Sequence, residues 1–382
     1  MIILSISLII YTFLIRRSAT LHTEEKNPSI CFLIPARDES KVIENLLKSI
    51  LNQTISINSK DIYVIVEDSK DDTVSICKKY GISVVVRKNL KLRTKGYAID
   101  EALKNIHKKY DLYFIIDADN ILDKNFVKEM LKSYKEGYDI VTGYRNIKNG
   151  NDSLVAAASG LIFSLLNNTL NKNRSKNNIP VILSGTGFCI KGNVINKFDG
   201  YPFNSLTEDY ELSLYSILNN LNTTYNNKAM FYDEQPIKFK NTINQRRRWI
   251  KGYFVNRKKY IPLFKNKNDS AKLELIGIKP YIMLVIGIIF WIVYFILKHK
   301  YLISILILIM IYFILSIITF LALKHDININ MSTKMKMNML WYFPIFLASY
   351  VLIAVSVLVN PNVEWKKVEH NRNIKTLKKY KI

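Results

Sequence analysis

The chain has 382 residues, of which 49% are hydrophobic, and a formal net charge of +24, so it can form one large or two ordinary domains with a sizeable core. Basic residues commonly crowd the cytoplasmic flanks of membrane helices, and no aromatic-interleaved basic module is present, so the charge gives no support for nucleic-acid binding. Three widely spaced cysteines, Cys31, Cys77 and Cys189, argue against a disulfide framework or a zinc site and indicate a reducing compartment.

Residues 1–17 are predicted to form a membrane anchor. The apolar run MIILSISLIIYTFLI has no positive charge before it and is followed by Arg16 and Arg17, which is the reverse of a secretory signal. This order predicts that the chain enters the cytoplasm after the anchor. The run reaches only about 22 Å as a helix, so either the helix is short or a longer one begins upstream of the given start.

Residues 28–255 are expected to form one α/β domain. Short β-branched runs alternate with amphipathic helical patterns, which predicts helices at 39–51, 72–81, 95–107 and 126–134 between strands at 30–34, 62–66, 82–86, 112–116 and 139–142. This succession predicts a mostly parallel sheet with helices on both faces. Such sheets bind ligands beyond the carboxyl ends of their strands, so the residues that follow each strand are the candidates for a site.

Acidic segments follow three of the predicted strands, namely PARDES at 35–40, EDSKDDT at 67–73 and DADN at 117–120. Like charges gathered at one edge of a sheet repel unless a cation joins them. Asp117 and Asp119 are two residues apart, so both carboxylates can face one ion in an extended segment. Hard oxygen ligands suit Mg²⁺ or Mn²⁺, which predicts a metal site; the simpler alternative is a capped loop.

Three further segments carry candidate ligand-binding residues. In NSLTEDYEL, Thr207 can cap a helix that Glu208 and Asp209 begin; helix charge complementarity alone is the simpler interpretation. In SGTGFCI, at 184–190, two glycines allow the backbone to pass close to a ligand. Lys95 is at the start of a predicted helix, where its ammonium either lies near a phosphate or is simply solvated.

The carboxyl-terminal part of the chain is expected to be membrane-bound. Residues 256–276 are predicted to be an interfacial amphipathic segment, followed over 277–359 by membrane helices near 280–297, 301–323 and 338–359. Three spans after one anchor would place the basic tail, 360–382, outside, yet its charge favours the inside. One alternative is that one apolar segment is interfacial or re-entrant, and Pro344 favours 338–359 as that segment. The other alternative is that the start is truncated.

Taken in order, these segments resemble the family 2 glycosyltransferases. The similarity is closest to the membrane-embedded processive branch, which includes cellulose, chitin, hyaluronan and poly-N-acetylglucosamine synthases and carries the pattern D, D, D, QxxRW. The segment NTINQRRRWIKG, at 241–252, supplies the last element through Gln245, Arg248 and Trp249. The resemblance covers roughly residues 30–255, and QRRRW followed by membrane helices is its most specific part.

The resemblance implies a role for each matching position. Donor contacts are implied for Ala36, Arg37, Lys95, Asp117, Gln245 and Arg248. The uracil or ribose would be contacted by Glu67 or by Asp68, because EDSKDDT aligns with or without a gap. The metal ligands would be Asp117 and Asp119, and the general base would be Asp209. Trp249 would stack on the terminal sugar, and the other acceptor-binding positions would be Thr207, Glu208, Gly185, Thr186 and Gly187. Arg246 and Arg247 occupy variable positions and are expected only to face lipid headgroups.

As a whole, the resemblance implies a multi-pass cell-membrane enzyme whose cytosolic GT-A domain uses Mg²⁺ or Mn²⁺. The leading hypothesis is an inverting enzyme that polymerises a UDP-hexose or UDP-N-acetylhexosamine into a β-linked polysaccharide and passes it through its own helices. The alternative is a non-processive enzyme that adds one sugar to a lipid acceptor. A non-catalytic sensor or exporter subunit would lack one of the acids, and none is missing. The implied partners are a UDP-sugar, a glycan or lipid acceptor, membrane lipids and accessory export or regulatory subunits.

Overall fold

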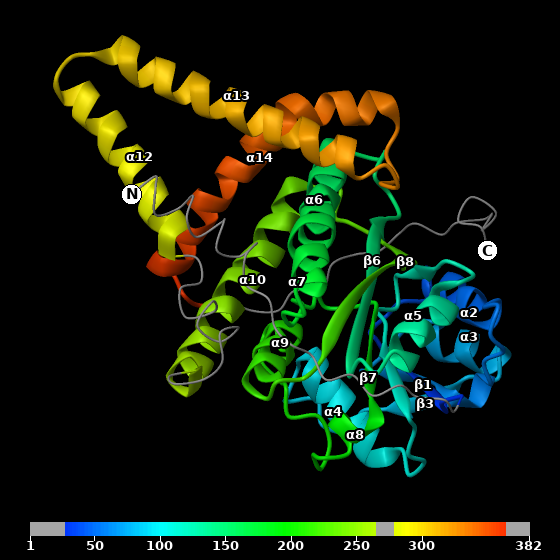
Figure 1. Ribbon diagram of the computed structural model, residues 1–382. Helices are drawn as coiled ribbons and strands as arrows, with labels where there is room; N and C mark the ends of the chain where they lie inside the picture. The colour runs from blue at the N-terminus through cyan, green and yellow to red at the C-terminus, as the bar shows by residue number, and fades with distance from the viewer. Residues whose placement is uncertain (1–26, 265–278, 364–382) are drawn as a thin grey trace.

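The computed structural model describes residues 27–264 and 279–363 (Figure 1). The predicted anchor at residues 1–17 lies outside these ranges, as do part of the predicted interfacial segment and most of the basic tail. Within the described ranges, an α/β domain is joined to a helical hairpin and one further long helix.

An eight-stranded sheet forms the centre of the α/β domain, in the order β3-β2-β1-β4-β7-β6-β8-β5. Its strands are β1 (Ile30–Ala36), β2 (Ile62–Val66), β3 (Ser83–Val86), β4 (Leu112–Ile115), β5 (Ile121–Leu122), β6 (Ile140–Ile147), β7 (Phe188–Lys191) and β8 (Thr223–Asp233). Strands β3, β2, β1 and β4 are parallel neighbours, and β6 is parallel to β8. Strand β7 is antiparallel to both β4 and β6, and β5 is antiparallel to β8. The predicted mostly parallel sheet is confirmed.

Three strands escaped the sequence analysis for identifiable reasons. Strand β8 mixes asparagine and lysine with apolar residues, so it shows no clean alternation. Strand β7 directly follows two glycines that suggested a ligand loop, and β5 has only two residues. Pairing with strands that are distant in the sequence defines all three: β8 pairs with β6 and β5. Strand β7 lies between β4 and β6 and thereby joins the two halves of the sheet.

Helices cover both faces of the sheet. One face packs against α2 (Ile43–Leu51), α3 (Thr73–Lys79) and α5 (Phe126–Lys135), and the short η1 (Ser59–Asp61) precedes β2. The other face packs against α4 (Lys95–Asn105), α8 (Gly192–Ile195) and α9 (Glu208–Leu218). Each predicted helix is present, although α2 begins four residues later than the apolar pattern suggested. These layers fix the carboxyl ends of β1, β2 and β4 at one edge of the domain.

A second group of helices lies beside this edge (Figure 1). One continuous rod consists of α6 (Leu154–Leu165), the π-helix η2 (Leu166–Asn171) and α7 (Lys172–Lys176), and beside it runs α10 (Phe239–Tyr260), which ends in η3 (Ile261–Phe264). The stretch Leu154–Lys176 is long and apolar enough to cross a membrane, but 56% of its most apolar window is buried inside the protein. Its hydrophobicity is therefore used for packing against β6 and α14 (Thr333–Val359).

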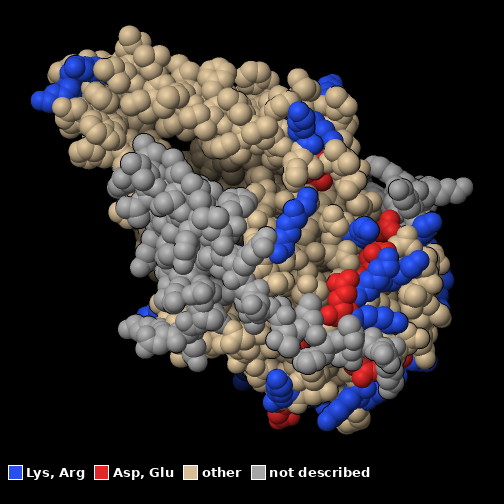
Figure 2. All heavy atoms as spheres, viewed as in Figure 1, with Lys and Arg blue, Asp and Glu red and all other residues tan. Residues whose placement is uncertain are grey.

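The predicted carboxyl-terminal spans correspond to α12 (Lys279–Leu297), α13 (Tyr301–His325) and α14. Helices α12 and α13 form a hairpin that projects from the α/β domain, and the face of it seen in Figure 2 is almost entirely uncharged apart from its tip. By length and composition α13 and α14 are both able to cross a membrane, yet 6% of the α13 window and 28% of the α14 window are buried in the protein. These helices support association with a membrane, and they differ in how much of their surface the protein covers.

Candidate active site

A cavity of about 1060 Å³ lies beyond the carboxyl ends of β1, β2 and β4 and is closed on the other side by α10, α12 and α14. Most of the residues predicted for the site line it: Ala36, Arg37, Glu67, Lys95, Asp117, Asp119, Gly185, Thr207, Glu208, Asp209, Gln245, Arg248 and Trp249. These positions lie in seven separate segments of the sequence. The fold brings them to one cavity because the parallel strands end together and α10 crosses in front of them.

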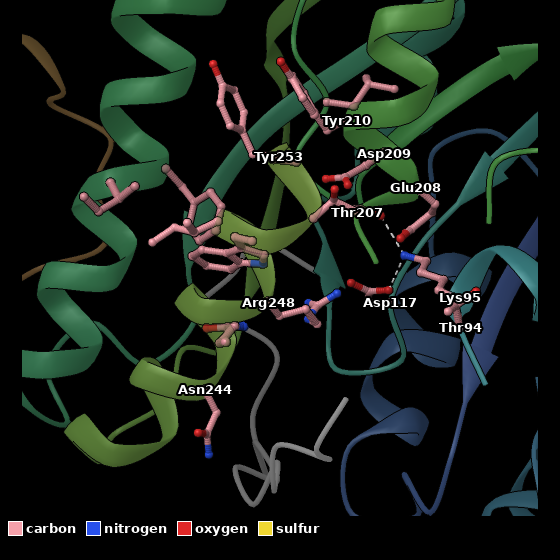
Figure 3. Close-up of a pocket in the computed structure, with 18 of the residues that line it drawn as sticks. Thr94, Lys95, Asp117, Thr207, Glu208, Asp209, Tyr210, Asn244, Arg248 and Tyr253 are labelled. Carbon is pink, nitrogen blue, oxygen red and sulfur yellow. Dashed lines mark hydrogen bonds and ion pairs between the residues drawn. The ribbon is translucent and has the colours of Figure 1, made fainter. Parts of the chain in front are cut away.

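Lys95 is the central cation of the polar end of the cavity (Figure 3). It begins α4, whose amino-terminal cap is Thr94. Its Nζ lies 2.5 Å from Oδ1 of Asp117 and donates to the carbonyl oxygen of Gly185 at 2.6 Å. Burial raises the pKa of the carboxyl groups of Glu208 and Asp209, and the charge of Lys95 opposes this shift. The interpretation of Lys95 as a merely solvated helix residue is therefore wrong.

Glu208 and Asp209 open α9 beside this lysine. Burial raises the pKa of both carboxyl groups, and the charge of Asp209 raises the pKa of Glu208 further. Arg248 opposes these shifts from α10, where its Nη1 donates to the carbonyl oxygen of Leu206 at 2.8 Å. Two carboxyl groups in one turn thus lie near two cations, and groups with such perturbed pKa values are candidates for a catalytic base.

Thr207 precedes these acids and is held by α10. It occupies the cap position of α9, as predicted, but its side chain makes no capping hydrogen bond. Its Oγ1 instead accepts from Nδ2 of Asn256 at 3.0 Å, and a Cβ added at Gly252 would lie 2.3 Å from that Oγ1. The Glu208–Asp209 turn therefore depends on close contact with α10, through two residues that the sequence analysis did not single out.

A second acidic group, also missed, comes from the end of β8. Asp233 and Glu234 line the cavity, and Arg145 of β6 donates to Oδ2 of Asp233 through both Nε and Nη2. Burial raises the pKa of Asp233, while Arg145 lowers it and the charge of Asp119 raises it. The signal was present in MFYDEQP, where acids follow an apolar run as they do after β2 and β4, but the strand itself was not recognised.

Arg145 also contacts an aromatic pair at the edge of the cavity. Its guanidinium lies 3.6 Å from the ring centroid of Phe163, which in turn packs edge-on against Trp249 with centroids 5.7 Å apart. A stack of this kind limits the rotation of the indole. Trp249 is thus held at the border between the acids and the apolar part of the cavity.

Three arginines surround Glu67, namely Arg37 after β1 and Arg87 and Arg93 from the loop between β3 and α4. The Oε2 atom of Glu67 accepts from Nη1 of Arg87 at 2.5 Å, and Arg37 and Arg93 each approach Oε1 at 3.7 Å. Asp68, the alternative assignment, does not line the cavity and adopts a positive φ of 44°. The repulsion between acidic strand ends, which had suggested a metal, is therefore relieved at Glu67 by side-chain cations.

Two of the predicted acceptor residues do not reach the cavity. Thr186 is fully buried, where its Oγ1 accepts from the backbone N–H of Asp117 at 2.8 Å and donates to Oδ1 of Asn120 at 2.6 Å. Gly187 lies against Phe231, whose ring a Cβ would meet at 2.0 Å. Thr186 supports the Asp117–Asp119 loop from behind, Gly187 bonds to Ile115 of β4 and Gly143 of β6, and Gly185 lines the cavity.

The Asp117–Asp119 pair fits a hard divalent ion that also binds a diphosphate. Among residues 27–264 and 279–363, no group of three or more histidine, cysteine or acidic side chains is arranged to hold a metal alone. An ion shared with phosphates needs only one or two protein carboxylates. The Asp117 side chain is 36% exposed, so it remains open to the cavity although Lys95 pairs with one oxygen, and Asp119 lines the same cavity.

The arginines of QRRRW separate into two faces of α10. Arg248 lines the cavity, whereas Arg246 is 1% exposed and Arg247 donates to Ser356 and Asn360 at the end of α14. The guanidinium of Arg246 lies 4.5 Å from the ring centroid of Phe346 and 4.7 Å from that of Tyr350. The expectation that Arg246 and Arg247 only face lipid headgroups is therefore wrong, because α14 covers that face of α10.

The α/β fold and its acid-lined cavity define the class of protein. The model of the family described as "Glycosyltransferase like family 2" matches residues 28–252, more than half of the chain. The protein belongs to this family of glycosyltransferase-like proteins. Its membership in the processive membrane branch stays a prediction.

Two relatives illustrate the extent of the similarity. The probable glycosyltransferase YdaM of Bacillus subtilis (strain 168) is 25% identical over 267 residues, which are 65% of this chain and 61% of that protein. The chain thus matches less than two thirds of that relative. The mannosyltransferase PcManGT from Pyrobaculum calidifontis, solved in complex with GDP-Man and Mn²⁺, has a TM-score of 0.56 with 14% identity, covering 94% of both chains. This second similarity extends the shared fold to the helices that follow the catalytic domain.

Proposed function

We propose that the protein transfers a single sugar from a nucleoside-diphosphate sugar to an acceptor carried by a membrane lipid. The observation that supports this proposal is the two-sided lining of the cavity. Acidic and basic side chains line the end formed by the sheet, while aliphatic side chains of the membrane-associated helices line the other end. A lipid-borne acceptor has the same two-sided chemistry, with a polar head that reacts and an apolar tail.

The apolar end is continuous with the proposed membrane region. Helix α12 contributes Val285, Ile286 and Ile289, and α14 contributes Val351, Ala354, Val355 and Leu358. Ile162 and Leu166 of the α6–η2 rod face the same space. Lipid tails bind to such surfaces because burial of apolar area is favourable. A growing polysaccharide would instead need hydroxyl-binding polar groups along its path.

In the proposed reaction, Asp209 takes the proton of the acceptor hydroxyl while the hydroxyl oxygen attacks the anomeric carbon of the donor sugar. The bond from that carbon to the diphosphate breaks, and the nucleoside diphosphate leaves with the electron pair. Arg248 and Lys95 stabilise the charge of the departing diphosphate, and the Thr207 turn orients the base. A divalent ion held by Asp117 and Asp119 would neutralise part of the same charge.

The donor is proposed to be a UDP-sugar, with Glu67 in place of Asp68 at the nucleoside. Glu67 lines the cavity at the end of β2 together with Ala36 and Arg37 at the end of β1. A panel of UDP-, GDP- and dTDP-sugars, offered with Mg²⁺ or Mn²⁺, tests this choice through release of the nucleoside diphosphate. Turnover with GDP-sugars alone would contradict it, and no turnover with any donor would favour a non-catalytic role.

Product size separates single transfer from polymerisation. Membranes containing the protein would be incubated with the preferred radiolabelled donor, extracted with organic solvent, and the product sized by chromatography. We expect one labelled species in the organic phase, which disappears in membranes containing the Asp209→Asn variant. A ladder or a high-molecular-weight product in the aqueous phase would instead support the processive synthase.

A further inference from the structure

The turn between α13 and α14 is bonded to the α/β domain through one buried acid (Figure 1). Helix α13 ends at His325, and Asp326 follows as its carboxyl-terminal cap and is 3% exposed. The hydroxyl of Tyr144, in β6, lies 2.8 Å from each carboxylate oxygen of Asp326 and donates to this carboxylate. The hydroxyl of Ser164, in α6, donates to Oδ2 of the same carboxylate. One acid at the end of α13 therefore joins β6 to α6.

The surroundings of this carboxylate make its hydrogen bonds important. A charge removed from water is costly unless donors satisfy it, and loss of one partner from a buried hydrogen bond leaves the other unsatisfied. Tyr144 and Ser164 are themselves 2% and 3% exposed, so bulk water does not take the place of a lost partner. The three side chains therefore fix the spacing between β6 and α6 at this point.

The sequence neighbours of the two hydroxyl-bearing residues form the stack against which Trp249 packs. Arg145 follows Tyr144 in β6, and Phe163 precedes Ser164 in α6. The guanidinium of Arg145 lies 3.6 Å from the ring centroid of Phe163, which packs edge-on against Trp249. Successive side chains of a strand point to opposite faces, so Tyr144 faces the α13–α14 turn while Arg145 faces the cavity. The buried carboxylate thus bonds to the immediate neighbour of each member of the stack.

We propose that Asp326 is a positioning residue for Trp249. By holding β6 and α6 at a fixed spacing, it keeps Arg145 stacked on Phe163 and so limits the rotation of the indole. Trp249 is predicted to contact the acceptor, so the inference rests on the proposed transfer reaction. Because the apolar window of α13 is only 6% buried inside the protein, the inference links a membrane-associated helix to an acceptor-binding residue.

Other contacts should keep the fold intact when Asp326 is replaced. A Cβ added at Gly160 of α6 would lie 2.1 Å from the side chain of Ile147 of β6, so the two elements pack closely there. In η2, Nδ2 of Asn167 donates to the carbonyl oxygen of Arg145 at 3.3 Å. Loss of the carboxylate should therefore loosen the stack without separating β6 from the α6–η2 rod.

Fluorescence quenching measures the environment of Trp249 directly. The chain has four tryptophans, and replacement of Trp291, Trp341 and Trp365 by phenylalanine leaves Trp249 as the single emitter. This full-length protein, reconstituted in lipid nanodiscs, is the reference into which further substitutions are placed. Quenching by acrylamide then reports how readily a small molecule reaches the indole from the cavity.

Two substitutions break the proposed link. Asp326→Leu removes both acceptor oxygens at similar size, and Tyr144→Phe removes only a hydroxyl. We expect the quenching constant of Trp249 to rise by about twofold in each variant, because the indole loses its fixed packing. Asn330→Ala is the matched control: it removes a bond from the same turn to the carbonyl oxygen of Ile147 and should leave quenching unchanged. No rise in either test variant, or an equal rise in the control, would overturn the proposal.

A double variant separates positioning from a general loss of stability. Tyr144→Phe should add nothing when it is combined with Asp326→Leu, since both substitutions remove the same hydrogen bond. Additive increases in quenching would show that Tyr144 acts independently of Asp326, which contradicts the proposal.

Steady-state kinetics provide an independent measurement. In Tyr144→Phe, the KM for the acceptor should rise by about fivefold, while release of the nucleoside diphosphate without acceptor stays at the wild-type rate. An equal decrease of transfer and of acceptor-free release would indicate a structural role alone and would contradict the proposal. If the wild-type protein transfers sugar to no acceptor, the proposed function fails, whereas the quenching result for Asp326 still decides whether it positions Trp249.

Discussion

The two ends of the cavity are built by different means. At the polar end, hydrogen bonds and ion pairs fix side chains that follow β-strands, as where Thr186 holds the backbone of Asp117 and Lys95 pairs with its carboxylate. At the apolar end, residues such as Ile289 and Val355 protrude from single helices and are 49% and 52% exposed. Catalytic groups must be held in a fixed geometry relative to the substrate. The apolar tail of an acceptor needs only a continuous apolar surface to bind. Mutations should therefore affect catalysis at one end and acceptor affinity at the other.

The largest effect should come from the proposed base. Asp209→Asn keeps the size and hydrogen-bonding capacity of the side chain but removes its ability to accept the proton, so kcat should fall by about 10³-fold. The KM for the donor should change little, which steady-state kinetics with the preferred nucleotide sugar would show. A variant that retained more than a tenth of the wild-type rate would exclude Asp209 as the base.

The next largest effect distinguishes the two faces of α10. Arg248→Ala removes a cation from the leaving group and should lower kcat by about 10²-fold. Arg247→Ala, the matched control, loses only its bonds to α14 and should retain most of the activity. Rate measurements under identical conditions compare the two, and equal losses would show that the cluster acts through bulk charge.

A smaller effect is expected at the apolar end. Ile289→Asn places a polar group where a lipid tail is proposed to lie, which should raise the KM for the lipid acceptor by roughly tenfold with little change in kcat. Leu302→Asn on α13, which is 69% exposed and does not line the cavity, is the control. Should both variants behave like the wild type across an acceptor titration, the apolar wall would not bind the acceptor.

The smallest effect is a pH dependence of stability. The pKa of Glu208 is raised from 4.5 to about 7, mainly by burial. The folded state then holds a proton that the unfolded state has lost, so the contribution of Glu208 to stability is complete below about pH 4.5 and is lost as the pH rises through 7.

Glu208→Gln removes this titration. Its melting temperature should match that of the wild type near pH 4.5 and exceed it by a few degrees at pH 8. Thermal unfolding in detergent, followed by intrinsic fluorescence at several pH values, measures the difference. Glu136→Gln, at an exposed position on the surface, is the control and should show no such trend. A constant offset across the pH range would contradict the assignment.

The sequence analysis succeeded where local pattern and strand topology decide position. The acids after β2 and β4 reach one edge because parallel strands end on the same side, and apolar runs at 301–323 and 338–359 form helices as expected. It failed where partners come from distant segments. Nothing near Glu67 in the chain indicates Arg87 and Arg93, and the pairing of Asp233 with Arg145 requires β8 to lie beside β6.

The QRRRW segment illustrates the same division. Its sequence by itself determined a cationic helix whose first, fourth and fifth positions match those of a glycosyltransferase family, because residue type and spacing suffice to define such a motif. Only the tertiary structure decided what each arginine contacts. Helix periodicity turns Arg248 toward the acids and Arg246 and Arg247 toward α14, and hydrogen bonds from a segment about one hundred residues away determine which of these charges is buried.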